Sequence, residues 1–345
     1  MPIKTPPAIP RREWIDVGFL VEKLKDKVHL NLTLCAGESV CAHKRVSEAT
    51  LHRPGLALSG YLDLFTHHRI QILGNTETEY LKSCSKSDQI NRFEQLLSFD
   101  IPVLFVTNNN KLPDYLENIA REKQTPLFYT NTQTTLFMAL LQDFLEDQFA
   151  LQTMVHGTMV DVYGIGILIV GKSGIGKSEV ALDLVERGQR LVADDAVMLT
   201  RKGSVLMASA TDVNKHFMEI RGLGVLDVLS MFGIRAIRYQ KRLEVVMELT
   251  LWNEQETVER TGLGNEKINM LDVDIPIIRL PMTPGKNITV VAETIAMNHL
   301  SKHYGYDPAV AFQKRVQSAI ESKQLNSDEN NSLKRAVDYF EGDIE

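Results

Sequence analysis

The chain of 345 residues carries 38 basic and 44 acidic side chains, so its formal net charge is −6, and 44% of its residues are hydrophobic. This composition is ordinary for a soluble globular protein, and a prior of about 150 residues per domain predicts two domains. The acidic balance argues against a general nucleic-acid binder, which needs a predominantly basic surface. The longest apolar run, Ile165 to Val170, is too short to cross a membrane, and the Pro-rich start has no signal-peptide pattern.

The cysteines are few and widely spaced. Cys35, Cys41 and Cys84 form no C-x-x-C motif, and their number is odd. This usage favours free thiols in a reducing cytoplasm, with no cysteine-bound metal.

The first 150 residues predict a small α/β domain. Apolar residues with helical spacing predict an amphipathic helix over 16–27. Short β-rich runs at 30–34, 70–73 and 103–106 alternate with helical stretches at 77–81 and 88–97. No catalytic arrangement of side chains is present in this half, which favours a structural or assembly role.

A long apolar-rich stretch, 135–154, predicts a helix that links two halves. We therefore expect a Pro-rich lead-in over 1–14, an α/β domain with its linker helix over 15–150, a second domain over 151–321, and an acidic tail over 322–345. The boundary near residue 150 is a prediction to within several residues.

The clearest motif matches the pattern G-x-x-x-x-G-K-[ST]. We call it the phosphate loop, and it comprises Gly171, Lys172, Ser173, Gly174, Ile175, Gly176, Lys177 and Ser178. An apolar, β-branched run precedes it, and residues with helical spacing follow it. In such a strand–loop–helix unit the backbone N–H groups and the helix N-terminus face a phosphate, the lysine meets the β- and γ-phosphates, and the serine ligates Mg²⁺. The sequence therefore predicts ATP and Mg²⁺ as cofactors.

Two aspartates end the next predicted strand, 190–193. Asp194 and Asp195 lie within eighteen residues after Lys177, which is closer than the metal-binding aspartate of an ordinary P-loop NTPase and indicates a different sheet order. One can hold Mg²⁺ or its waters and one can accept a hydroxyl proton; the alternative is a pair of turn-forming residues. His156 lies before the strand that leads into the loop, and taken alone it is more typical of a structural histidine.

Three further segments carry candidate residues. Glu219 and Arg221 lie beside two glycines, which suits close approach to a phosphate or metal, or else a surface turn with a salt bridge. Arg260 precedes a Gly-rich turn and could clamp a transferring group. A Pro- and Gly-containing segment carries Lys286.

Together these segments resemble the bacterial HPr kinase/phosphorylase family. The resemblance rests on "GKSGIGKSE", "LVADDAV", "EIRGLGVLDV", "ERTGL" and "PMTPGKN", in that order, with "VHGTMVDVYG" before them, and on the less specific "RPGLALSGY" and "RIQILGNTETEYL" in the first half. It covers most of the chain. It implies an enzyme that phosphorylates a serine of the phosphocarrier protein HPr with ATP and regulates carbon metabolism. It also implies the reverse reaction, in which inorganic phosphate attacks phosphoserine-HPr and releases pyrophosphate.

The same resemblance implies an α/β fold with a phosphate-loop catalytic domain similar to the phosphoenolpyruvate carboxykinase core, and a hexamer. It places the catalytic residues at His156, Lys177, Asp195 and Arg260, and the Mg²⁺ ligands at Ser178 and Glu219. A catalytic segment serving both directions would comprise Met218, Glu219, Ile220, Arg221, Gly222, Leu223, Gly224, Val225, Leu226 and Asp227. A phosphorolysis loop would comprise Pro281, Met282, Thr283, Pro284, Gly285 and Lys286.

One departure concerns Lys286, which stands where arginine is expected and offers a point charge in place of a two-pronged donor. Two other functions stay open at this point: a small-molecule kinase or carboxykinase-like enzyme on the same core, and an ATP-binding scaffold with weak turnover. The scaffold is disfavoured because a mere binder needs no acid–base aspartate. A protein kinase of the Gly-rich-loop type is excluded, since neither HRD nor DFG occurs.

Overall fold

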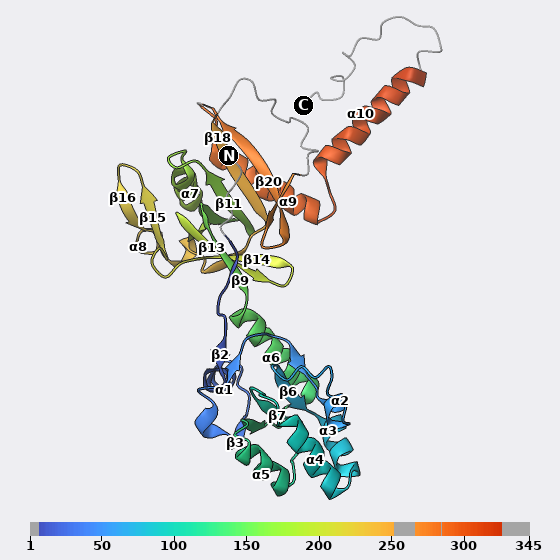
Figure 1. Ribbon diagram of the computed structural model, residues 1–345. Helices are drawn as coiled ribbons and strands as arrows, with labels where there is room; N and C mark the ends of the chain where they lie inside the picture. The colour runs from blue at the N-terminus through green and yellow to red at the C-terminus, as the bar shows by residue number, and fades with distance from the viewer. Residues whose placement is uncertain (1–6, 252–265, 284, 326–345) are drawn as a thin grey trace, which may run out of the picture. The chain divides into compact units, whose positions relative to one another are not determined.

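The computed structural model describes residues 7–251, 266–283 and 285–325 (Figure 1). The chain divides into two compact units. Of the described residues, one unit holds those up to Thr153 together with Thr200–Ser204, and the other holds Met154–Leu199 and those from Val205 onward.

The N-terminal unit is a five-stranded sheet covered on both faces. Its strand order is β3-β8-β7-β6-β5, with β5 to β8 parallel and β3 antiparallel at one edge. The strands are β3 (Thr33–Ala36), β5 (Leu51–His52), β6 (Ile70–Leu73), β7 (Leu104–Val106) and β8 (Leu127–Tyr129). A separate short pair joins β2 (Ile15–Asp16) to β4 (Arg45–Val46).

Alternate residues of these strands face two different cores. On one face the sheet packs against α1 (Val17–Asp26) and α6 (Thr134–Gln148). On the other face it packs against α2 (Gly55–Leu58), α3 (Asn75–Ser83), α4 (Lys86–Leu96) and α5 (Asp114–Glu122). This is the two-sided burial that a parallel sheet requires.

Most predicted elements of this half are confirmed, and two boundaries are wrong. Helix α1 begins after Asp16, whose carboxylate accepts the N–H of Phe19, and the strand at 70–73 has the expected bounds. The helix expected over 135–154 ends at Gln148, and β9 (Leu151–His156) follows it. Residues 153–155 are buried, exposed and buried in turn, a period of two that overrides the apolar character of the stretch. The strand expected at 30–34 is β3, which begins at Thr33.

The C-terminal half is built around a six-stranded sheet in the order β12-β10-β11-β18-β20-β19. Three central strands are parallel: β11 (Ile165–Gly171), β18 (Val245–Leu251) and β20 (Val273–Met282). The remaining strands are antiparallel to their neighbours: β10 (Thr158–Val162), β12 (Arg190–Ala193) and β19 (Lys267–Met270). Strand β10 therefore separates β12 from β11, which is the altered sheet order that the aspartate spacing indicates.

This sheet also lies between two cores. Helices α7 (Lys177–Glu186) and α9 (Ile288–His303) pack on one face. The other face packs against strands of a second sheet, ordered β1-β9-β13-β14-β17, whose further members are β1 (Ile9–Pro10), β13 (Ala196–Lys202), β14 (Val205–Ala210) and β17 (Gln240–Arg242). Because both faces are covered, β11 is buried along almost its whole length.

The remaining elements are small or peripheral. Strands β15 (Phe217–Ile220) and β16 (Gly224–Asp227) form a hairpin, which α8 (Val228–Phe232) follows. Helix α10 (Pro308–Leu325) ends the described part of the chain. None of the helices in the described ranges combines the length and apolar character needed to cross a membrane.

The N-cap of α1 provides a test of the local structure. Asp16→Ala should destabilise the helix by about 1 kcal/mol, because it removes the acceptor for the Phe19 N–H, whereas Asp16→Asn should retain most of the cap. Hydrogen–deuterium exchange of the α1 amides should rise about fivefold in the alanine variant only. Equal exchange in both variants would show that the cap contributes nothing.

Candidate active site at the phosphate loop

The phosphate loop connects β11 to α7 and depends on three glycines. Gly171, Gly174 and Gly176 have φ values of 149°, 78° and 106°, which other residues rarely adopt. A Cβ added to Gly171 would lie 2.6 Å from the carbonyl oxygen of Leu249 on the neighbouring strand, and one on Gly174 would collide with the guanidinium of Arg221. The loop therefore needs glycine for its backbone conformation at all three positions, and at Gly171 also for the close contact with the neighbouring strand.

Lys177 is held inside this loop. Its side chain is 7% exposed, and Nζ lies 3.3 Å from the carbonyl oxygens of both Gly171 and Lys172. Burial lowers the pKa of Lys177, and the nearby carboxylates of Asp194 and Asp195 oppose that shift. The ammonium group thus lies at the centre of the loop, where a phosphate would meet it.

A single buried carboxylate joins the elements around the loop. Asp194, at the end of β12, is 1% exposed. It accepts hydrogen bonds from Thr158 Oγ1 at 2.6 Å, from Ser178 Oγ at 3.0 Å to each oxygen, and from the backbone N–H of Glu219 at 3.1 Å. These donors lie on β10, α7 and β15. Asp194 therefore fixes the loop serine and the start of the hairpin relative to the sheet.

Its neighbour Asp195 faces the opposite environment. The Asp195 side chain is 65% exposed, and its backbone is left-handed with φ of 66°. His156 Nδ1 lies 3.0 Å from Asp195 Oδ1 and 3.0 Å from its carbonyl oxygen. The two aspartates thus differ in kind: one is a buried anchor, and the other is an accessible carboxylate paired with a histidine.

The segment that the resemblance expects to be catalytic, 218–227, lies in the β15–β16 hairpin. Met218 is buried beneath it, while Glu219 is exposed on β15 and pairs in register with Val225. Arg221, in the turn, donates from Nη2 to Ser173 Oγ at 3.0 Å. The hairpin therefore contacts the phosphate loop at two points, through the Glu219 backbone by way of Asp194 and through the Arg221 side chain.

The segment expected to form a phosphorolysis loop, 281–286, begins at the same end of the sheet as the phosphate loop. Pro281 and Met282 end β20, which pairs with β18, and β18 pairs with β11 as it enters the phosphate loop. A Cβ on Gly176 would lie 3.9 Å from Met282 Cε. Lys286 is exposed. Two expected residues, Arg260 and Pro284, lie outside the described residues.

Sequence reasoning did not find every residue of this site. The Asp-Asp doublet drew attention to Asp194 without showing that it is the buried member. Thr158 lies within the segment VHGTMVDVYG, but nothing in that segment marked it as a partner of Asp194. Asn214 lies in no motif, and its Nδ2 donates to the carbonyl oxygens of Asp194 and Ala196 at 2.6 and 2.8 Å. No spacing pattern in the sequence predicts hydrogen-bond partners that are so far apart along the chain.

The oxygen donors beside the loop fit Mg²⁺ bound together with a nucleotide. Ser178 Oγ and the Asp194 carboxylate are adjacent, and the backbone N–H of Glu219 donates to the same carboxylate. Within the described ranges, no group of three or more His, Cys, Asp or Glu side chains is placed to hold a metal. Mg²⁺ commonly takes one or two carboxylates and completes its ligands with water and substrate phosphates.

These features define a class of protein: an α/β phosphotransferase-type core with a glycine loop at a helix N-terminus, a loop lysine and an exposed carboxylate beside it. Comparison with known proteins is more specific. A family model described as "HPr Serine kinase C-terminal domain" matches residues 147–316, and one described as "HPr Serine kinase N terminus" matches residues 19–145.

Curated relatives agree with these matches over nearly the whole chain. HPr kinase/phosphorylase of Chloroherpeton thalassium is 49% identical over 97% of this chain and 98% of its own. The protein of the same name from Prosthecochloris aestuarii is 51% identical over 86% of this chain and 88% of its own. A solved structure of the Hpr(Ser) kinase/phosphatase from Coxiella burnetii is 31% identical, with a TM-score of 0.42, and covers 46% of this chain and 97% of its own. The chain belongs to the HPr kinase/phosphorylase family.

Two loop substitutions test the assignment of the phosphoryl site. Lys177→Ala and Ser178→Ala should each reduce turnover by about 10²–10³ in both reaction directions, because each removes a major contact at one shared site. Initial rates with ATP and HPr, and with phosphoserine-HPr and phosphate, measure this. Near-normal turnover of Lys177→Ala in both assays would show that the loop is not the phosphoryl site.

Proposed function

We propose that this protein uses ATP to phosphorylate a serine of HPr, and that it also catalyses the reverse phosphorolysis of phosphoserine-HPr to pyrophosphate. Family membership supports the reaction, since relatives carrying the name HPr kinase/phosphorylase align over 97% of the chain. The observation that carries the proposal at the site is the exposed Asp195–His156 pair beside a buried Asp194. A protein hydroxyl can approach an exposed carboxylate without entering a closed cavity.

Asp195 is the proton-handling residue in this proposal. In the forward direction its carboxylate accepts the proton of the HPr serine as the serine oxygen attacks the γ-phosphorus of ATP. In the reverse direction the same carboxyl group returns the proton to the departing serine oxygen, as microscopic reversibility requires. His156, 3.0 Å away, orients that carboxylate.

The phosphates are held by the loop. Its N–H groups and the Lys177 ammonium bind the phosphate oxygens, and Arg260 is proposed to contact the transferring group. Ser178 and Glu219 are proposed to hold Mg²⁺, with Asp194 positioning Ser178. When bound, the ion would neutralise charge on the phosphate oxygens. The catalytic segment would act in both directions.

The finer assignments rest on the family resemblance. We propose that the core is related to that of phosphoenolpyruvate carboxykinases, that the protein assembles as a hexamer, and that the domain boundary lies near residue 150. We propose a cytoplasmic location, since all three cysteines are free thiols in the structure. A small-molecule kinase is not favoured, because the relatives are named for HPr.

The direct test of this function uses purified protein, HPr and labelled ATP, with the label mapped to a residue. The proposal expects phosphoserine in HPr, and loss of that label with pyrophosphate formation when inorganic phosphate is added. Transfer to a small molecule but not to HPr would contradict it.

Asp195→Asn tests the proton-transfer role. It should leave nucleotide affinity nearly unchanged, because the loop amides do not contact Asp195, while serine transfer falls by about 10²–10⁴. Nucleotide affinity from calorimetry is compared with the initial rate. Parallel losses in affinity and transfer would make Asp195 a metal ligand.

Substitutions of Lys286 test whether this residue contributes more to phosphorolysis than to the kinase reaction. ATP brings its own phosphates, whereas phosphorolysis must capture free phosphate, so an added cation matters more in reverse. Lys286→Ala should cost the reverse reaction about 1–2 kcal/mol more of transition-state stabilisation than the forward reaction. Lys286→Arg should retain or raise phosphorolysis, because guanidinium offers two donors to phosphate. Equal losses in the two assays would assign the loop to general substrate docking.

A further inference from the structure

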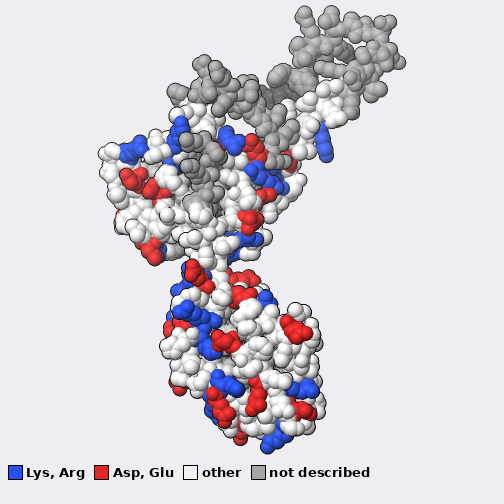
Figure 2. Space-filling view, in the orientation of Figure 1, with Lys and Arg blue, Asp and Glu red and all other residues white. Residues whose placement is uncertain are grey.

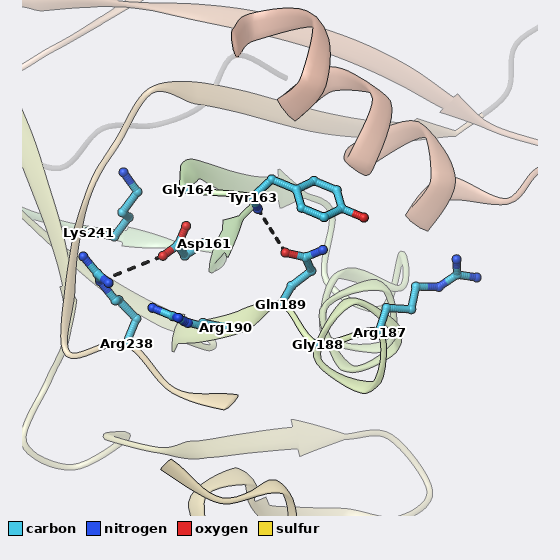
Figure 3. A pocket seen from close by; sticks show the side chains of 9 residues that line it. All are labelled: Asp161, Tyr163, Gly164, Arg187, Gly188, Gln189, Arg190, Arg238 and Lys241. Atoms are coloured by element: carbon cyan, nitrogen blue, oxygen red, sulfur yellow. Dashed lines mark hydrogen bonds and ion pairs between the residues drawn. The ribbon is translucent and has the colours of Figure 1, made fainter. Parts of the chain in front are cut away.

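A cavity of about 420 Å³ lies at the end of α7 remote from the phosphate loop (Figure 3). Its walls come from the end of β10 and the turn after it, the three residues that follow α7, the start of β12, and β17 with the segment before it. Helix α7 has ten residues, so about 15 Å of helix separates this cavity from Lys177. The cavity is therefore distinct from the candidate active site.

Four cationic side chains line the cavity, and they differ in the acidic partners that they already have. Arg187 already forms ion pairs with acidic side chains of α7 and α9, and Lys241 forms one with Glu244 at 3.0 Å. Arg190 has no ion pair among the described residues. One acidic residue, Asp161, also lines the cavity. In Figure 3 Arg187 points away from Asp161, whereas Arg190 and Arg238 lie on the same side of the cavity as Asp161.

The acidic residue, Asp161, has a poorly satisfied carboxylate. It is 5% exposed and lies on β10 opposite Arg190 in the sheet register. Its Oδ1 atom is buried with no hydrogen-bond partner among the described residues. Its Oδ2 atom lies 3.9 Å from Arg238 Nε, beyond hydrogen-bond distance. A buried carboxylate oxygen without a donor is costly, so this wall of the cavity is suited to a ligand that donates a hydrogen bond.

We propose that this cavity binds a small oxyanion that carries its own hydroxyl group, with hydrogen phosphate as the simplest case. The guanidinium groups of Arg190 and Arg238 take the charged oxygens, and the hydroxyl donates to Asp161 Oδ1. The volume, at the lower end of the range for small-molecule sites, also admits a hydroxyl-bearing organic part on the anion.

The carboxylate makes the site selective. Hydrogen phosphate keeps a proton at neutral pH and can donate to Asp161, whereas sulfate has no proton to donate. A sulfate oxygen next to the Asp161 carboxylate would bring together two negatively charged acceptors with no proton between them, so the carboxylate would repel sulfate. Selection of phosphate over sulfate is the property that distinguishes this site from a general basic patch.

The test measures phosphate and sulfate affinity by calorimetry at constant ionic strength, with the full chain carrying Lys177→Ala so that the phosphate loop contributes little. Phosphate should bind at least about tenfold more tightly than sulfate, the worth of one hydrogen bond to a charged group. Asp161→Asn should reduce this ratio to about twofold or less, because an amide can donate to either anion. The result does not depend on whether the chain phosphorylates HPr.

Further variants keep the test decisive if Asp161→Asn does not fold. Arg190→Gln and Arg238→Gln should each weaken phosphate binding about tenfold, while Arg235→Gln, an exposed cation outside the cavity, should leave it unchanged. Equal affinity for the two anions, no phosphate binding to the Lys177→Ala chain, or unchanged affinity in both cavity arginine variants would overturn the proposal.

Discussion

The site depends on one buried carboxylate. Asp194 accepts hydrogen bonds from β10, α7 and β15, so three elements that are distant in the chain share one acceptor. Removing that acceptor would leave buried donors unpaired, each at a cost of about 1–3 kcal/mol. The positions of Ser178 and of the β15–β16 hairpin follow from this contact, and Asp195 extends into solvent because its neighbour is fixed inside.

The sheet order makes this arrangement possible. Strand β10 lies between β11 and β12 and runs antiparallel to both, so the aspartate doublet ends a strand that is not adjacent to the loop strand. Thr158, at the start of β10, lies between them and donates to Asp194. At their other end, β10 and β12 contribute Asp161 and Arg190 to the wall of the cavity (Figure 3). On the surface visible in Figure 2, acidic and basic side chains are interspersed.

Local features of the fold were predictable from the sequence, and long-range ones were not. The helix capped by Asp16 and the strand–loop–helix around Lys177 follow from periodicity and glycine spacing, and the structure contains both. The predicted end of α6, at residue 154, was wrong because the apolar composition of the stretch did not distinguish a helix from the two-residue period of β9. The separate environments of Asp194 and Asp195 depend on Thr158 and Asn214, which only the folded sheet brings near.

The most direct test of the account is the nucleotide affinity of Asp194→Asn, measured by calorimetry together with hydrogen–deuterium exchange at Glu219. An asparagine amide would face the donors of Ser178 and Thr158, so the account predicts affinity at least about tenfold weaker and faster exchange of the Glu219 amide. Wild-type affinity with unchanged protection at Glu219 would contradict the claim that this carboxylate holds the site together.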